Sequence, residues 1–361
     1  MHRFTYGTAH RRGAVQVIGL SLVALVAAAC GSTSSGTTSS APASGGTSSA
    51  PAAAPDNVVV GIALSPPKMV FLAPYVAEAK GYFAKENINV KFLPMPNGLE
   101  TELGTTSGAI DFGFSSATDA IESAAAGSPI HAIWSYAPKL DTQCIAAGNV
   151  NTAKDLVGQN VGSTGTGGFS YTQVYACLKP AGVEVKQIKL INMTRSQFVP
   201  SLVSNRIKAA VFHADDAYTV LHSGVSLKVL DNEYESMPQW WYGGVTVLDS
   251  YAKSNPDLVK RFLTALVEAD RWMTDPTNKD EVIQIGVKYT QEDQAAVAYA
   301  YDFIVKGHLW TLNDGMDPAA VQYTSQQLLN FKEIDKIPSY DQVVDNSYIN
   351  SVLDTLGRVP E

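Results

Sequence analysis

Two blocks of alternating strand and helix patterns constrain this fold more than any other feature of the chain. In the first block, residues 58–63 form an apolar β-branched run, and residues 72–83 follow with apolar residues at helical spacing. Further strand patterns at 90–93, 110–114 and 130–136 alternate with helix patterns at 99–106 and 118–126. Such alternation at short spacing predicts an α/β fold with a mainly parallel sheet.

The pattern then restarts and predicts a second α/β block. Its strand patterns lie at 144–147, 160–162, 185–191, 209–212 and 227–230, with helices at 152–156, at 169–178 and after Thr194. One more strand pattern at 243–248 precedes helical patterns at 256–274, 280–289, 292–306, 318–330 and 347–356. Because about 300 residues exceed what one core usually holds, we expect two lobes and a helical C-terminal wrap.

The first 56 residues predict export. Arg3, Arg11 and Arg12 precede an apolar run at 14–29, and Cys30 follows its final small residues directly. This is a signal peptide with a small-residue cleavage site, and the cysteine makes it resemble a bacterial lipoprotein signal. Residues 1–29 would then be removed and Cys30 lipidated; an ordinary secretory signal with a chance cysteine is the alternative. Residues 30–56, almost all Gly, Ser, Thr, Ala and Pro, are expected to form a disordered tether.

Charge and hydropathy limit the partners of the exported chain. Removing residues 1–29 takes three arginines from the 26 basic residues and leaves 23 against 34 acidic ones, a net charge of −11. This balance argues against a nucleic-acid partner and against a polybasic membrane contact. No later apolar run is long enough to span a bilayer. We therefore expect a monomer on the extracytoplasmic face of the cell membrane, held only by its lipid.

The remaining cysteines leave two possibilities open. Once Cys30 carries lipid, Cys144 and Cys177 remain. In an oxidising compartment two such thiols favour a disulfide, whereas two separate buried thiols are equally compatible with the sequence.

Polar residues follow the strand patterns of the first block. Ligands of open α/β sheets bind outside the carboxyl ends of the strands, where helix N-termini offer free N–H groups. Helix capping alone is the alternative role for such residues. The candidates are Ser65, Lys68 and Phe71 in the long loop 64–71, Asn97 after the second strand pattern, and Ser115 and Ser116 after the third.

A glycine-rich segment, residues 162–171, joins a strand pattern to a helix pattern in the second block. Glycines allow a close backbone approach and an anion-binding nest, although a flexible turn is the alternative. The spacing matches neither the P-loop nor the dinucleotide fingerprint. Its candidate ligand contacts are Thr166, Gly167, Gly168 and Tyr171.

Two candidates lie later in the second block. Asp215 follows the strand pattern at 209–212, where its carboxylate can bind a ligand amine or only favour the helix start. Trp241, within Trp240-Trp241-Tyr242, can stack on a ligand ring or pack between the lobes.

Catalytic and metal-binding patterns are weak. Residues 113–117 miss the second glycine of the serine-nucleophile motif, and the histidines of the exported chain lack metal-ligand spacing. We therefore predict a protein without metal or cofactor that performs no chemistry.

Several motifs carry a family resemblance. The segments APYVAEAKGYF (73–83), GAIDFG (108–113), KDLVGQNVG (154–162) and NPDLVKRFL (255–263) resemble periplasmic-type binding proteins of ABC importers for alkanesulfonates, taurine, nitrate and thiamine-pyrimidine precursors. The resemblance covers about residues 57–330 and implies a type II periplasmic-binding-protein-like fold with two crossing strands between lobes that close on a ligand. Lobe I would comprise 57–138 and 243–361, and lobe II 139–242. Most of the candidates above occupy the family's contact positions, but loop 64–71 lacks the histidine or tryptophan of some members.

The sequence thus predicts a solute-binding lipoprotein that captures a sulfonate, a pyrimidine or a related nitrogen-containing or aromatic compound. It would deliver this solute to permease and ATPase subunits encoded as separate chains. An exported enzyme of the same fold and a ligand-sensing lipoprotein are the alternatives.

Overall fold

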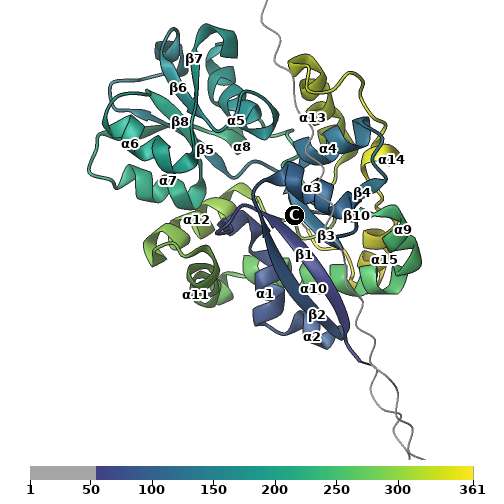
Figure 1. Ribbon diagram of the computed structural model, residues 1–361. Helices are drawn as coiled ribbons and strands as arrows, with labels where there is room; N and C mark the ends of the chain where they lie inside the picture. Colours follow the sequence, from purple (N-terminus) through teal and green to yellow (C-terminus); the bar gives the residue numbers. More distant parts are fainter. Residues whose placement is uncertain (1–53, 361) are drawn as a thin grey trace, which may run out of the picture. The chain divides into compact units, whose positions relative to one another are not determined.

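The computed structural model describes residues 54–360, which belong to one compact unit (Figure 1). The signal segment, Cys30 and nearly all of the tether lie outside the described residues, so their predictions stay predictions. Among the described residues, the structure has no helix that is both long and apolar enough to cross a membrane.

Five strands form the sheet of the first lobe, in the order β2-β1-β3-β10-β4. They are β1 (Asp56–Ala63), β2 (Ile88–Met95), β3 (Phe112–Ser116), β4 (Ile130–Ala137) and β10 (Gly243–Leu248). β1 pairs parallel with β2 and β3, whereas β10 runs antiparallel to β3 and β4. The sheet is therefore mixed, which strand–helix alternation alone does not predict.

The second sheet repeats this plan in the order β7-β6-β8-β5-β9. Its strands are β5 (Thr142–Ala147), β6 (Asn160–Ser163), β7 (Lys189–Asn192), β8 (Ala209–His213) and β9 (Leu227–Asn232), and β5 is the antiparallel one. In each sheet the antiparallel strand is the first one formed after the chain crosses between lobes, through residues 138–141 or 233–242. It enters at the edge where the other strands end, so it must run against them.

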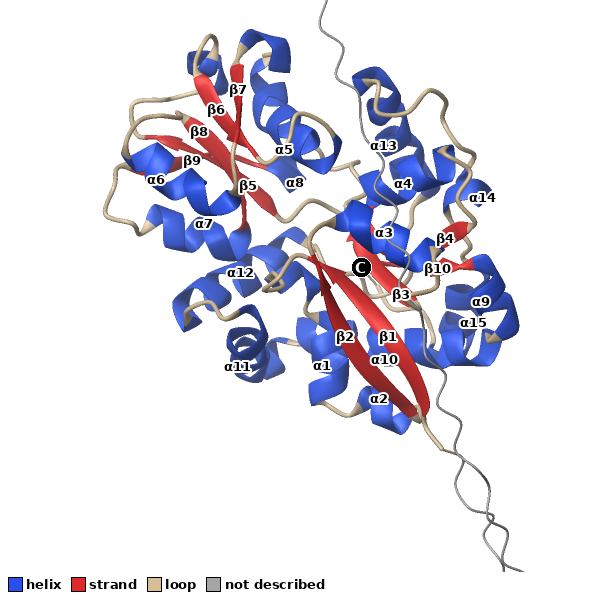
Figure 2. Ribbon diagram, in the orientation of Figure 1, coloured by secondary structure: helices blue, strands red, loops and turns tan. Residues whose placement is uncertain are grey.

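Helices cover both sheets (Figure 2). Lobe I contains the first sheet with α1 (Ala73–Ala79), α2 (Tyr82–Lys85), α3 (Gly98–Thr106), α4 (Ala117–Ala125), α9 (Asp249–Ser254), α10 (Pro256–Thr274), α11 (Lys279–Thr290), α12 (Gln294–Gly307), α13 (Pro318–Phe331), α14 (Tyr340–Val343) and α15 (Ser347–Leu356). Lobe II contains the second sheet with α5 (Gly168–Leu178), α6 (Phe198–Val203), α7 (Ala214–Leu221) and α8 (Glu233–Ser236).

The longest helix shows how the core of lobe I forms. α10 starts with Pro256 at its first turn, where a missing N–H costs nothing. Its buried face carries Phe262, whose ring stacks on Phe112 and Phe83 with centroid separations of 3.8 and 5.3 Å. The predicted helix at 72–83 splits into α1 and α2 because Gly81 adopts a positive φ of 74°.

Two local predictions need correction. Residues 185–187 form a 3-10 turn rather than strand, and only β7 is extended. The reason is a capping box in which Glu184 and Gln187 satisfy each other's backbone N–H groups. β1 also begins at Asp56, the residue assigned to the end of the tether, which accepts a hydrogen bond from Arg261 at 2.6 Å.

The structure joins Cys144 on β5 to Cys177 on α5 by a disulfide, which confirms the bonded alternative. Both residues lie in the buried cluster that covers one face of the second sheet. The bond spans 33 residues of sequence, and in the chain-entropy account a loop of that length is stabilised by about 3–4 kcal/mol.

The C-terminal helices also contact lobe II. On α12, the Tyr299 hydroxyl donates to Gln143 Oε1 at 2.9 Å, and its ring lies 5.7 Å from that of Tyr218. On α13, the Phe331 ring lies 4.6 Å from that of Tyr175. The predicted wrap therefore links the lobes as well as covering lobe I.

Candidate functional site

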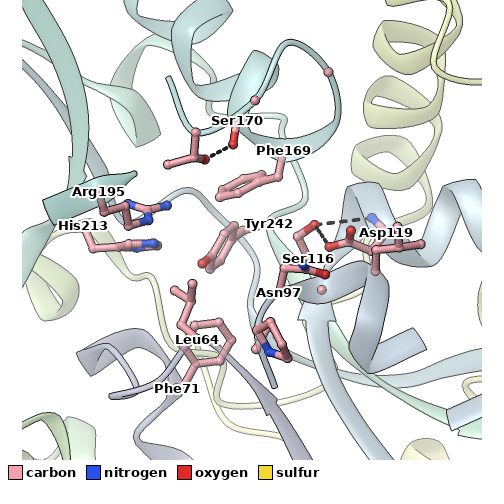
Figure 3. A pocket seen from close by; sticks show the side chains of 17 residues that line it. Leu64, Phe71, Asn97, Ser116, Asp119, Phe169, Ser170, Arg195, His213 and Tyr242 are labelled. Atoms are coloured by element: carbon pink, nitrogen blue, oxygen red, sulfur yellow. Dashed lines mark hydrogen bonds between the residues drawn. The ribbon is translucent and has the colours of Figure 1, made fainter. Parts of the chain in front are cut away.

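A cavity of about 470 Å³ lies where strand ends of the two lobes meet (Figure 3). Lobe I lines it with loop residues after β1, β2 and β3, and lobe II with residues after β6, β7 and β8. The topology explains this position, because ligand sites in open α/β sheets lie outside the carboxyl ends of the strands.

The lobe I wall consists of two helix starts. Asn97 caps α3 and accepts the Glu100 N–H at 2.9 Å, and Ser116 caps α4 and accepts the Asp119 N–H at 3.3 Å. The Ser116 hydroxyl also donates to the Asp119 carboxylate. Burial raises the pKa of Asp119, while the Ser116 hydrogen bonds oppose that shift. The helices approach closely here, since a Cβ on Gly98 would lie 1.9 Å from Asp119 Oδ2.

The lobe II wall presents a guanidinium and an imidazole. Arg195 belongs to a short 3-10 helix, Arg195–Gln197, and its side chain makes no hydrogen bond or ion pair within residues 54–360. His213 is the last residue of β8 and is fully buried. Its Nδ1 lies 2.9 Å from both carboxylate oxygens of Asp141, whereas its Nε2 has no partner within the described residues.

Aromatic rings form the third side of the cavity. The Tyr242 ring lies 5.2 Å from that of Phe169 and 6.5 Å from that of Phe71, measured between centroids. Tyr136 packs against two of these rings: its centroid lies 5.0 Å from that of Phe71, and its ring is edge-on to that of Tyr242. Rings so held bury large apolar area and offer faces on which a planar ligand can stack.

A buried carboxyl group supports the lobe I wall from behind. Glu102 accepts hydrogen bonds from the hydroxyls of Ser115 and, at 3.0 Å, Thr246. Burial raises the pKa of Glu102 to about 8, although these two bonds oppose the shift. Ser115 is thus turned toward Glu102 and away from the cavity, while the next residue, Ser116, lines it.

The structure brings some of the predicted contact residues together and not others. Phe71, Asn97, Ser116 and Gly167 line the cavity. Thr166 and Gly168 flank Gly167 in the same turn, while Ser65 and Lys68 line a neighbouring hollow of about 490 Å³. Tyr171 packs its ring on Phe331, 5.1 Å away on α13.

Lys68 and Asp215 lie outside the cavity, in one cluster between the lobes. Lys68 Nζ lies 2.7 Å from Asp216 and 3.0 Å from Glu292, and Asp215 accepts the Met69 N–H at 3.1 Å. We call these four side chains, Lys68, Asp215, Asp216 and Glu292, the Lys68 cluster. The cluster connects two parts of lobe I, loop 64–71 and the segment just before α12, to the first turn of α7 in lobe II.

Trp241 also lies outside the cavity and is fully buried. Its indole Nε1 donates to Ser135 Oγ at 3.0 Å, and its N–H donates to Thr324 Oγ1 at 2.9 Å. The residue next to it, Tyr242, lines the cavity instead.

Several lining residues are not among the contacts predicted from the sequence: Leu64, Asp119, Phe169, Arg195, His213 and Tyr242. His213 ends β8 and Arg195 follows β7, so the strand-end rule applied to those strands would have found them. No sequence signal separates Tyr242 from its tryptophan neighbours.

Comparisons with known proteins agree with this fold. The family model described as NMT1/THI5 like matches residues 68–279. The riboflavin-binding protein RibY of Chloroflexus aurantiacus is 27% identical over 281 residues, which cover 76% of this chain and 77% of that protein. A formylaminopyrimidine-binding protein of Halalkalibacterium halodurans is 25% identical over 233 residues, 63% of this chain and 69% of that protein.

Solved structures share the two-lobed α/β architecture. The periplasmic aliphatic sulphonate binding protein SsuA of Escherichia coli superposes with a TM-score of 0.66 at 16% identity, covering 81% of this chain and 92% of that one. A desulfurization enzyme, DSZB, superposes with a TM-score of 0.62 at 14% identity, covering 83% and 99%. The predicted binding-protein fold is thus confirmed, and the fold itself accommodates both binding proteins and an enzyme.

Proposed function

Because this chain belongs to the NMT1/THI5-like family, we propose that it is an extracytoplasmic solute-binding protein of an ABC importer. It captures one small organic molecule between its lobes and delivers that molecule to permease and ATPase subunits on separate chains. The cavity is the observation that carries this function, since both lobes line it. A ligand that touches both walls favours the closed arrangement, because only that arrangement makes both sets of contacts.

The chemistry of the cavity supports a ring-bearing ligand. Phe71, Phe169 and Tyr242 offer aromatic faces, and polar groups stand on either side of them. Two relatives are named for riboflavin and formylaminopyrimidine, both nitrogen heterocycles. The predicted contacts Asn97, Ser116 and Gly167 remain in the proposed site, and residues 138–141 and 233–242 serve as its hinge.

A ligand screen tests the proposal. Thermal unfolding of the protein is measured with flavins, pyrimidines, sulfonates and nitrate, each at high concentration. We expect one class to stabilise the fold, by about 2.7 kcal/mol at 100 times Kd. Phe169→Ala should weaken that binding, whereas Phe303→Ala on α12, a buried phenylalanine that does not line the cavity, should not. If no class binds, or if a binder is not taken up by cells in a manner that depends on this protein, the import function is refuted.

An enzyme of the same fold is the second candidate, and one pair of residues favours it. Asp141 orients His213 toward the cavity, and an imidazole so held can act as a general base. The lining residues include no cysteine, and the pair lacks an evident nucleophile partner. Mass spectrometry of the bound compound after incubation separates the two functions, because recovery of a chemically altered compound would establish catalysis.

The membrane anchor belongs to the same proposal and rests on the sequence around Cys30. Lipid on this residue would hold the protein on the outer face of the cell membrane, as a monomer. Replacing Cys30 by alanine should move the protein from the membrane fraction to the soluble extracytoplasmic fraction. Unchanged membrane fractionation of this variant would overturn the anchor.

A further inference from the structure

The two walls of the cavity differ in charge (Figure 3). Lobe II presents Arg195 and His213 side by side, and lobe I presents Asp119 with Ser116 and Asn97. A ligand that bridges the walls therefore meets cationic donors at one end and an acid at the other. At the lobe II end, the Arg195 guanidinium and His213 Nε2 have no hydrogen-bond partner within the described residues.

Arg195 is an unpaired cation on a fixed backbone. Thr194 and Gln197 form a capping box around it, with the Thr194 N–H donating to Gln197 Oε1 at 3.1 Å. The guanidinium is always charged and carries five N–H donors, yet it makes no hydrogen bond or ion pair within residues 54–360. A half-buried guanidinium that faces a cavity without a carboxylate partner is positioned to bind the anionic group of a ligand.

His213 adds a second, independent observation. Asp141 accepts from Nδ1, which fixes the tautomer and leaves Nε2 with a lone pair in the neutral ring. Nε2 is buried, unpartnered within the described residues, and directed to the cavity in Figure 3. A neutral Nε2 can only accept a hydrogen bond, so it must gain a proton before it can donate to an anion.

The charges around His213 determine when it gains that proton. Asp141 on the crossing segment and Asp215 on α7 are acidic, whereas burial raises the pKa of Glu233 on α8 well above its usual value and favours its neutral form. Arg195 is cationic, and the cationic Lys68 acts through Asp215. Tyr136 and Tyr242 stay neutral because burial raises the pKa of each phenol well above its usual value. In the empty site Arg195 opposes an imidazolium, and an anion bound between them removes that opposition.

We propose that Arg195 and His213 form an oxyanion subsite in lobe II, and that His213 takes up a proton from solvent as the anion binds. The inference rests on the proposed function and narrows its ligand to ring-bearing molecules with a carboxylate, sulfonate or phosphate. The ring lies on the aromatic side of the cavity, and a donor group of the ligand faces Asp119. No covalent bond forms or breaks, and the proton returns to solvent on release.

Benzenesulfonate and benzenesulfonamide are matched probes for this subsite. They share a ring and similar size, but only the sulfonate is charged, and it stays ionised across neutral pH. Calorimetry should show that the sulfonate binds about tenfold or more tightly than the sulfonamide, as expected for charge-assisted hydrogen bonds. Titrations in two buffers of different ionisation enthalpy should show net proton uptake when the sulfonate binds.

Two variants, each with a control, test the contributions of Arg195 and His213 separately. Arg195→Gln should abolish the preference for the charged probe, whereas Arg206→Gln, on the exposed surface of the same lobe, should leave it intact. His213→Gln should abolish proton uptake, and the exposed His222→Gln should not. Because Arg195 has no partner to lose within the described chain, its variant remains informative even if His213→Gln fails to fold.

Each outcome decides the proposal. Charge preference lost in Arg195→Gln together with buffer-dependent enthalpy supports it. Equal affinity for the two probes, no detectable binding of the sulfonate, or binding without proton uptake overturns it. These failures differ from failure of the import function, because the broader ligand screen can still identify a neutral ligand.

Discussion

Replacing Lys68 by methionine should lower the free energy of unfolding by about 3–5 kcal/mol at pH 8, the usual cost of removing one partner from a buried ion pair. The Lys68 side chain is 11% exposed, and it faces the carboxylates of Asp216 and Glu292 with Asp215 close by. Burial alone would lower the pKa of Lys68, but these carboxylates outweigh it and hold the amine charged. Methionine fills similar volume and leaves Asp215 buried without its nearest cation.

The loss of stability in Lys68→Met should depend on pH. Burial raises the pKa of Asp215 to about 6 even while Lys68 opposes the shift, so without Lys68 this pKa rises further. A carboxyl with a raised pKa in the folded state is neutral at low pH, and its cost accumulates as the pH rises from the unfolded-state pKa to the folded-state pKa. Raising the folded-state pKa of Asp215 above 6 extends this loss to higher pH. Chemical denaturation of Lys68→Met should therefore show a smaller loss at pH 5 than at pH 8.

A matched control removes an exposed ion pair. Lys80 lies 2.7 Å from Glu281, and the Glu281 side chain is 51% exposed. Lys80→Met should cost less than about 1 kcal/mol. Adding Asp215→Asn to Lys68→Met should recover part of the loss, since the fully buried carboxyl of the cluster then carries no charge. Equal losses for the two lysine variants would contradict the assigned role of the Lys68 cluster.

Helices with strong periodicity and clear ends were predictable from the sequence. The predicted bounds 256–274 and 347–356 coincide with those of α10 and α15. Proline at the first turn fixes the start of α10, and a repeated apolar stripe fixes its length. The 3-10 turn at Val185–Gln187 was not predictable from hydropathy, because the reciprocal bonds of Glu184 and Gln187 outweigh the β-branched run.

The site was predictable to the level of loops but not of individual side chains. Three pairs show the same reason: Ser115 and Ser116, Trp241 and Tyr242, His213 and Asp215. Adjacent residues of an extended chain point to opposite sides, and the change from strand to helix turns Asp215 away from His213. Tertiary packing then decides which member of each pair faces the cavity. Thus Ser115 turns to Glu102, Trp241 to Ser135 and Asp215 to Met69, while their partners line the site.

The same packing explains why two charged candidates, Lys68 and Asp215, lie outside the cavity. Lys68 and Asp215 each follow a strand, as ligand contacts do, but Lys68 in loop 64–71 of lobe I faces Asp215 in the first turn of α7 in lobe II. Lys68 and Asp215 carry opposite charges and stabilise each other, whereas the Arg195 guanidinium has no ion-pair partner within residues 54–360. An unpaired charge in a cavity is therefore a better indicator of a ligand contact than a charge at a strand end.

A second large effect is expected from Glu102, which should make the protein less stable as the pH rises. Burial raises its pKa from 4.5 to about 8 in the folded state. Between these values the folded protein keeps a proton that the unfolded chain releases, so the free energy of unfolding falls with rising pH. One proton retained over roughly three pH units corresponds to roughly 2–4 kcal/mol between pH 5 and pH 9.

Glu102→Gln should remove most of that slope and leave the variant more stable than the wild type at pH 9. The amide keeps the shape of the protonated acid, and Thr246 can turn its hydroxyl to Gly113 O, 3.3 Å away, while accepting from the new amide. Melting curves at pH 5, 7 and 9 measure the effect, with Glu100→Gln on the exposed face of α3 as the control. Glu122, whose pKa burial also raises to about 8, contributes to the slope that remains, as do Glu233 and Asp270, whose pKa values burial raises well above the usual range. Parallel pH profiles for Glu102→Gln and wild type would show that Glu102 is already ionised behind the lobe I wall.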